Sequence, residues 1–204
     1  MGYMLPGPWA IPTEELAKMP GYRQPKDEDI AEAKRLLAEA GYPKGLKTSV
    51  ITRATMKAYV DAATIATENL SKVGIEAALT PLEDGTFWSR KFAGDFDLSS
   101  DGAAIAIADP DLLFGEHLVS GAAGNYGRYS NPKLDELFER QMRTVDDKER
   151  KKLVLEMERI ALADYPFATY YAMKLNAFFW SHVKNYAFQG YYLGQKFQDV
   201  WLAR

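Results

Sequence analysis

The clearest structural pattern in this chain lies in residues 47–82, which read KTSVITRATMKAYVDAATIATENLSKVGIEAALTPL. The pattern predicts a β-strand over residues 47–52, an amphipathic helix over 56–73 that Gly74 closes, and a second strand over 75–82. Two strands that a helix connects in this way pair in parallel, through a right-handed crossover. Residues 47–82 therefore predict a β-α-β unit.

Further elements are expected on both sides of this unit. The first 25 residues are rich in proline and are typical of a loop, whereas the aromatic chain from Phe167 onward has β propensity. The other expected elements are a helix that begins at Asp27 or Asp29, a helix over 86–92, a short strand over 96–102, and helices that begin near Asp109, Asn131 and Asp146. The last helix has apolar positions at Leu153, Leu155, Met157, Ile160 and Ala161. Together these elements predict an α/β fold with a mixed sheet flanked by helices.

The composition excludes several classes of protein. The chain of 204 residues has 25 Lys and Arg against 28 Asp and Glu, so no basic excess is present to neutralise the phosphates of a nucleic acid. Cysteine is absent, which excludes a disulfide scaffold, a cysteine nucleophile and a thiolate metal site. No run of about 18 apolar residues occurs, and the N-terminus lacks the basic and apolar regions of a signal peptide.

The sequence shows no catalytic or metal-binding constellation. Neither His117 nor His182 has a second ligand at metal-binding spacing, and the motifs of zinc proteases, phosphate-binding loops and nucleophile elbows are absent. Asp95, Asp97 and Asp101 occupy alternate positions of a short strand, which would place three like charges on one face. Because like charges are costly to bury together, we expect these residues at solvent. The sequence therefore predicts no enzyme, no cofactor and no metal site.

Aromatic residues make up 13% of the chain, and two explanations of this excess stay open. Aromatic platforms with few charges suit the recognition of peptides or sugars by stacking and burial. The same residues, among them Phe178, Phe179 and Trp180, can equally form a core or cover an interface.

Seven short motifs occur in a fixed order over nearly the whole chain. They are Asp29–Pro43 with its LLAEAGYP ending, Leu70–Glu76, Gly94–Leu98, Asp109–Asp111, Tyr129–Asp135, Ala161–Pro166 and Phe197–Trp201. In these motifs the chain resembles the C-terminal part of the family 5 extracellular solute-binding proteins of ABC transporters. That family includes dipeptide-, oligopeptide- and nickel-binding proteins.

The resemblance implies a lobe of the periplasmic binding protein type II-like fold. Family members are more than twice as long and close two lobes over a ligand, so the chain is expected to be the second lobe. It implies a hinge-side connector at 1–25, the ligand-binding lobe at 26–190, and a segment at 191–204 that returns to the missing N-terminal lobe. The full-length protein would be a monomer in the periplasm or at the extracellular face of the membrane. It would bind a peptide or another small solute and deliver it to an ABC permease in the membrane.

The resemblance also places the ligand site and shows one departure from the family. Peptide-binding members have a tryptophan and an ammonium-binding aspartate where this chain has Ala103 and Ala106, and an alanine cannot form that ion pair. Asp101 or Asp109 could compensate; otherwise a modified peptide, an oligosaccharide, an opine or another solute is expected. Because ligands of open α/β sheets bind at the carboxyl ends of strands, the expected ligand-binding residues are Ser100, Asp101, Gly102, Ala103, Ala104, Trp88, Asn125 and Tyr126.

Two other functions stay open from the sequence. The chain could be a free-standing interaction domain derived from such a lobe, in which the former inter-lobe face forms an exposed apolar patch. It could also be a hydrolase that uses Asp101 with a distant acid, although the sequence places no partner beside Asp101. The size of the native protein distinguishes a lobe from a free-standing domain.

Overall fold

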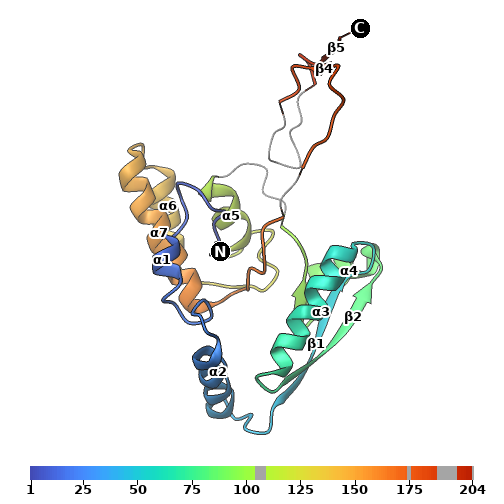
Figure 1. The fold of residues 1–204 in the computed structure, drawn as a ribbon. Coiled ribbons are helices and arrows are strands. Elements are labelled where there is room, and N and C mark those ends of the chain that lie inside the picture. The colour runs from blue at the N-terminus through green and yellow to red at the C-terminus, as the bar shows by residue number, and fades with distance from the viewer. Residues whose placement is uncertain (104–108, 174–175, 188–196, 204) are drawn as a thin grey trace. The chain divides into compact units, whose positions relative to one another are not determined.

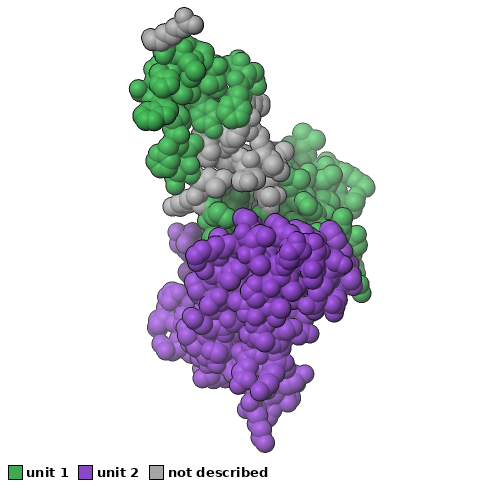
Figure 2. Space-filling model, turned by 90° about the vertical axis from the view of Figure 1, so that its right-hand side faces the viewer, with its two compact units in different colours: residues 1–11, 103–204 green, residues 12–102 purple. Residues whose placement is uncertain are grey.

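The computed structural model describes residues 1–103, 109–173, 176–187 and 197–203. The chain forms two compact units, drawn in purple and green in Figure 2. We call residues 12–102 the sheet unit, and residues 1–11 together with 103–204 the helical unit. The chain passes from one unit to the other after Ile11 and again after Gly102. The expected boundaries after residues 25 and 190 stay predictions.

The sheet unit contains a three-stranded parallel sheet. Its strands are β1 (Leu46–Arg53), β2 (Ile75–Leu82) and β3 (Leu98–Ser100), in the order β2-β1-β3. Helix α3 (Lys57–Ser71) connects β1 to β2 and packs on both, and α4 (Asp84–Ala93) follows β2 and contacts β1 (Figure 1). The predicted β-α-β unit is confirmed. Two helices precede the sheet in sequence, α1 (Thr13–Leu16) and α2 (Asp27–Glu39).

The central strand β1 supplies much of the core of this unit. Val50, Ile51 and Thr52 are consecutive in the chain and all are buried, which is the pattern of a strand covered on both faces. Ala63 of α3 and Phe87 of α4 are fully buried as well. Successive side chains of β1 point to opposite faces of the sheet. A slip of register by one residue would therefore move each of these side chains to the other face.

Two glycines mark the beginnings of β1 and β2. Gly45 and Gly74 both have a φ near the left-handed region, at 95° and 93°, which glycine adopts without a steric penalty. The amide of Leu46 donates to the Gly74 carbonyl at 3.0 Å, and a Cβ on Gly45 would lie 2.5 Å from that same oxygen. This close approach sets Leu46 opposite Ile75 in the register of the sheet.

The helical unit contains three helices whose beginnings were expected from their capping residues. They are α5 (Pro110–His117), α6 (Pro132–Met142) and α7 (Asp147–Asp164). The side chains of Asp109, Asn131 and Asp146 each accept hydrogen bonds from backbone N–H groups of the first turn, as N-cap residues do. The fully buried apolar residues of this unit are Phe114, Leu118, Leu134, Leu137, Val154, Met157 and Ala161.

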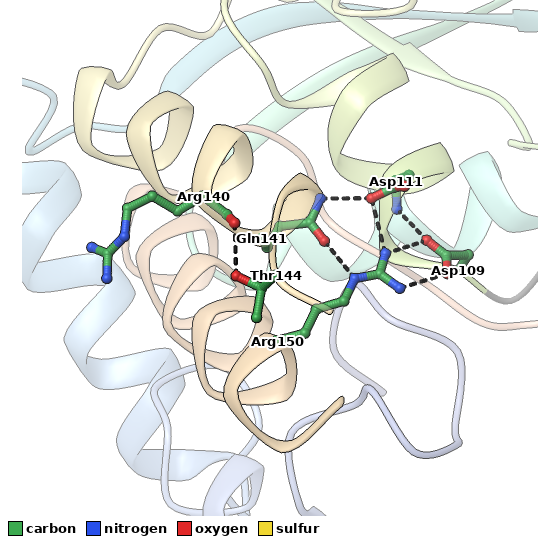
Figure 3. Close-up of polar contacts among 6 residues, drawn as sticks. All are labelled: Asp109, Asp111, Arg140, Gln141, Thr144 and Arg150. Atoms are coloured by element: carbon green, nitrogen blue, oxygen red, sulfur yellow. Dashed lines mark hydrogen bonds and ion pairs between the residues drawn. The ribbon is translucent and has the colours of Figure 1, made fainter. Parts of the chain in front are cut away.

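One arginine joins the three helices (Figure 3). The Arg150 guanidinium on α7 forms two hydrogen bonds with Asp109, at 2.7 and 3.1 Å, and a third with Asp111 at 3.0 Å. Its Nε donates to the fully buried Gln141 of α6 at 2.8 Å. The hydrogen bonds of Arg150 hold the pKa of Asp109 below its usual range. The guanidinium also lies 4.8 Å from the ring centre of Trp9, so it contacts the N-terminal segment too.

The N-terminal segment of residues 1–11 is fastened to α7 by a buried carboxylate. Both oxygens of Glu158 are used: Oε1 accepts from the amide of Met4 and Oε2 from the amide of Ile11, each at 2.9 Å. The side chains of Tyr3, Met4 and Ile11 are buried. Residues 1–11 contain no helix or strand, as predicted, and belong to the helical unit. The predicted loop over the first 25 residues is wrong at α1, where Thr13–Leu16 form one helical turn.

The end of the chain contains little regular structure among its described residues. β4 (Val183–Lys184) and β5 (Trp201–Leu202) pair in antiparallel fashion as a separate two-stranded sheet. The expected sheet flanked by helices is present, but its described strands are all parallel, and the antiparallel pair lies in the second sheet. Among the described helices, none has both the length and the apolar character needed to cross a bilayer.

Candidate functional site

The carboxyl ends of β1 and β3 bring a group of charged and aromatic side chains together in the sheet unit. Arg53 is the last residue of β1, and Asp101 and Gly102 directly follow β3. Thr52 of β1 lies opposite Ser100 of β3 in the parallel register, so the two strands end side by side. In open α/β sheets this is the edge at which ligands bind.

Arg53 lies between two aromatic rings and two carboxylates. Its guanidinium carbon is 5.8 Å from the ring centre of Trp88 and 5.9 Å from that of Tyr59. Its Nε and Nη2 donate to the two oxygens of Asp84, at 3.2 and 2.6 Å, and this bond raises the pKa of Arg53 and lowers that of Asp84. Its Nη1 lies 4.0 Å from Oδ1 of Asp101. One edge of the guanidinium is thus used, and Nη1 donates no hydrogen bond to any described residue.

Asp101 and Lys91 form a buried ion pair. Lys91 Nζ lies 3.2 Å from Asp101 Oδ2, and the two side chains are only 12% and 5% exposed. Burial lowers the pKa of Lys91, and Asp101 partly opposes this shift. The expectation that Asp101 lies at solvent is wrong, because Lys91 compensates its charge inside the fold. Asp95 and Asp97 are exposed, as expected.

Several buried polar atoms near this edge of the sheet have no hydrogen-bond partner among the described residues. They are Oδ1 of Asp101, Oγ1 of Thr52 and Oγ of Ser99. Buried polar groups are usually paired, so unpaired acceptors and hydroxyls here are consistent with a site that a ligand completes. Gly102 adds a close contact, because a Cβ on it would lie 2.5 Å from the Tyr59 hydroxyl oxygen.

The expected ligand-binding residues separate into three groups. Trp88, Ser100, Asp101 and Gly102 are brought together at this edge of the sheet unit. Ala103 is exposed and begins the next part of the helical unit, while Ala104 and Ala106 lie outside the described residues.

Asn125 and Tyr126 belong to the helical unit, and Asn125 has an evident structural task there. Its side-chain nitrogen donates to the carbonyls of Val119 and Tyr129, at 3.1 and 2.7 Å, and its oxygen accepts from the Tyr129 amide at 2.9 Å. The side-chain amide therefore holds its own loop together. A ligand contact of Asn125 or Tyr126 stays a prediction.

Sequence reasoning missed Arg53, Tyr59 and Lys91. Arg53 could have been found, because it ends a predicted strand and the same rule selected Ser100 to Gly102. Tyr59 and Lys91 lie in helices α3 and α4, and no pattern in the sequence distinguishes them from other helix residues. Their roles depend on contacts between elements far apart in the sequence.

The described residues contain no group of three or more histidine and carboxylate side chains that could hold a metal ion. His117 instead contacts the carbonyl of Gly124 through Nδ1, at 3.3 Å. The side chains that meet at the ends of β1 and β3 are charged and aromatic.

Comparison with known sequences identifies relatives. Residues 2–125 match the sequence model of "Bacterial extracellular solute-binding proteins, family 5 Middle". The nickel-binding protein NikA of Staphylococcus aureus is 29% identical over 154 residues, which are 73% of this chain and 31% of NikA. The glutathione-binding protein GsiB of Salmonella paratyphi A is 26% identical over 196 residues, 90% of this chain and 37% of GsiB. The chain spans about a third of the length of these relatives.

Solved structures agree with this assignment. The periplasmic binding protein DppA of Helicobacter pylori, in complex with the peptide STSA, matches with a TM-score of 0.60 and 28% identity, over 72% of this chain and 30% of DppA. OppA of Burkholderia pseudomallei matches with a TM-score of 0.74, over 91% of this chain and 37% of OppA; at 22% identity this likeness shows the fold alone. The expected α/β fold of a periplasmic binding protein is confirmed.

These relatives are binding proteins and not enzymes, in agreement with the expectation from the sequence. The resemblance that the seven motifs indicated is also confirmed, because the family match covers more than half of the chain. This chain belongs to family 5 of the bacterial extracellular solute-binding proteins.

Proposed function

We propose that this chain is the second lobe of a longer solute-binding protein, which binds a small solute outside the cytoplasm and delivers it to an ABC permease. Arg53 is the observation on which the binding role rests. The Arg53 guanidinium lies between Trp88 and Tyr59, and its Nη1 donates no hydrogen bond within the described part of the chain. This arrangement suits a ligand that brings a carboxylate or another strong acceptor and a flat or apolar part.

The ligand class follows from the same residues. Two relatives are named for the binding of nickel and of glutathione, and DppA was solved in complex with a peptide, so the family admits several kinds of solute. In this chain the aromatic rings supply stacking surface and Arg53 supplies a fixed cation. A peptide-like or other small carboxylate is the ligand that this combination fits best.

The aromatic side chains near the C-terminus support the assignment as one lobe. Phe178 and Trp180 are 95% and 77% exposed, and large exposed apolar groups usually mark an interface. In a two-lobed protein they would be covered by the N-terminal lobe. The length relation to NikA and GsiB points the same way.

The binding role is tested with the whole protein isolated from its source. Its bound solute is identified by mass spectrometry, and affinity is measured by calorimetry for the wild type and for Arg53→Met. Loss of one charged partner costs about 2–5 kcal/mol, so we expect affinity to fall roughly 30-fold or more. Lys47→Met is the matched control, because Lys47 lies at the opposite end of β1 and its side chain is exposed. Equal affinity of Arg53→Met and wild type would contradict the proposal.

The exposed aromatic residues also favour one alternative, a free-standing interaction domain derived from such a lobe. An antibody against this chain distinguishes the two on fractionated source cells. A band more than twice 22.9 kDa in the exported fraction supports the lobe. A band near 22.9 kDa in the cytoplasm supports the interaction domain and rules out the importer role.

A further inference from the structure

The ion pair between Lys91 and Asp101 lies within the proposed ligand site and has a consequence for which ligands the site accepts. Both side chains are almost completely buried. Lys91 Nζ also lies 5.0 Å from the ring centre of Trp88 and 5.3 Å from that of Phe87. Aromatic faces attract cations, so the ammonium group is held in place by two rings in addition to the carboxylate.

Asp101 is therefore flanked by two cations. Lys91 contacts its Oδ2 at 3.2 Å, and the Arg53 guanidinium faces its Oδ1 at 4.0 Å. Oδ1 accepts no hydrogen bond from a described residue. A cationic group that approached this carboxylate would meet two like charges that the protein already holds there.

We propose that Lys91 is a permanent counter-ion for Asp101 and a specificity-determining residue, which makes the site reject ligands that present an ammonium group and prefer ligands that present an acceptor to Arg53. The inference rests on the proposed function and deepens it. Lys91 acts by occupying the position that a ligand cation would need.

The charges of the neighbouring residues agree with this role. Asp84 accepts hydrogen bonds only from the Nε and Nη2 edge of Arg53, so Nη1 is the nitrogen of Arg53 that faces Asp101. Lys91 and Asp101 neutralise each other, so neither attracts a mobile ion. Lys91 need not contact the preferred ligand to give specificity. It acts by making the binding of a cationic ligand unfavourable.

The test uses two small probes of matched size, ethylammonium and propionate, added to the full 204-residue chain. Heteronuclear NMR follows the Arg53 Nε–H and Trp88 indole signals during each titration, at constant ionic strength. In the wild type we expect propionate to cause saturable shifts and ethylammonium to cause none. In Lys91→Met we expect ethylammonium to cause saturable shifts as well.

Lys91→Gln is the second variant, because a neutral amide can still donate to Asp101 and supports the fold if Lys91→Met is unstable. It should gain ethylammonium binding in the same direction. Lys47→Met, at the far end of β1, is the control that removes a lysine without touching the pair. It should leave both titrations as in the wild type.

The outcomes separate the two proposals. If ethylammonium binds equally well to the wild type, Lys91→Met and Lys91→Gln, the counter-ion inference is overturned. If the Lys91 variants gain ethylammonium binding as expected but propionate never shifts Arg53 or Trp88, the role of Lys91 as the counter-ion that excludes ammonium groups stands. In that case the preference of the proposed site for an acceptor is wrong.

Discussion

At the scale of single residues, the contact between Gly102 and Tyr59 is the most sensitive point of the site. A Cβ on Gly102 would lie 2.5–2.9 Å from three atoms of Tyr59. In Gly102→Ala the Tyr59 ring must shift, and this ring now lies 5.9 Å from the guanidinium carbon of Arg53. We expect a loss of about 1–3 kcal/mol in the free energy of unfolding, as for other overpacked positions. We also expect weaker ligand binding by the whole protein, measured by calorimetry beside urea unfolding.

Gly127→Ala is the matched control, because a Cβ at Gly127 would meet no atom within 4 Å. It should leave both stability and affinity unchanged within error. If Gly102→Ala binds ligand as tightly as the wild type, then the position of Tyr59 does not matter for recognition.

The site was only partly predictable at this scale. The rule that ligands bind at strand ends selected Ser100, Asp101 and Gly102 from the sequence, and the structure places them beside Trp88. Burial of Asp101 was not predictable, because its compensating charge comes from Lys91 on α4. A sequence pattern shows which residues share a helix face, but not which residue of another element will reach them.

At the scale of elements, we expect the attachment of residues 1–11 to α7 to depend on Glu158. Its two oxygens accept from two backbone amides, whereas a glutamine offers one acceptor and one N–H group that faces a donor. We expect Glu158→Gln to lower the free energy of unfolding by about 1–3 kcal/mol. Hydrogen exchange at the Met4 and Ile11 amides should become faster than exchange elsewhere in the helical unit. Unchanged protection of both amides would contradict this role.

Glu158 also makes stability depend on pH. Burial raises the pKa of its carboxyl, and the backbone hydrogen bonds of Met4, Ile11 and Tyr3 and the charge of Arg159 oppose the shift. A raised folded pKa adds stability that is fully present below the unfolded value and is lost as pH rises through the folded pKa. The stability of the wild type relative to Glu158→Gln should therefore increase from about pH 7 to about pH 5. Urea unfolding at both pH values measures this difference, and parallel pH profiles would contradict it.

The helices were more predictable than their buried faces. Capping residues fixed the beginnings of α5, α6 and α7 correctly. On α7 the expected apolar positions Met157 and Ala161 are fully buried, whereas Leu153 and Leu155 are half-buried. The fully buried face also contains Val154 and Glu158. A hydrophobic pattern cannot show that Glu158 belongs to this face, because its carboxylate is buried by hydrogen bonds from the N-terminal segment.

At the scale of the whole molecule, the sheet unit is one continuous piece of chain, whereas the helical unit is made of two. We expect residues 12–102 alone to fold, because the sheet, its covering helices and the ion pairs of Arg53, Lys91 and Asp101 all lie inside this range. Its stability should be on the order of 5 kcal/mol, the lower end for a domain. Urea unfolding followed by circular dichroism should show a single cooperative transition, and a gradual loss of signal would contradict the expectation.

Gly45 and Gly74, at the beginnings of β1 and β2, limit where the chain can be changed to alter its ligand specificity. Eight-residue strands extend roughly 26 Å, so the tight contact of Gly45 with Gly74 at one end sets where Arg53 stands at the other. Insertions after Arg53 or Leu82 alter loops without moving that reference point. One residue added between Gly45 and Arg53 would turn the arginine to the opposite face of the sheet. New ligand preferences are therefore best sought by varying the loops that follow the strands, with both glycines kept.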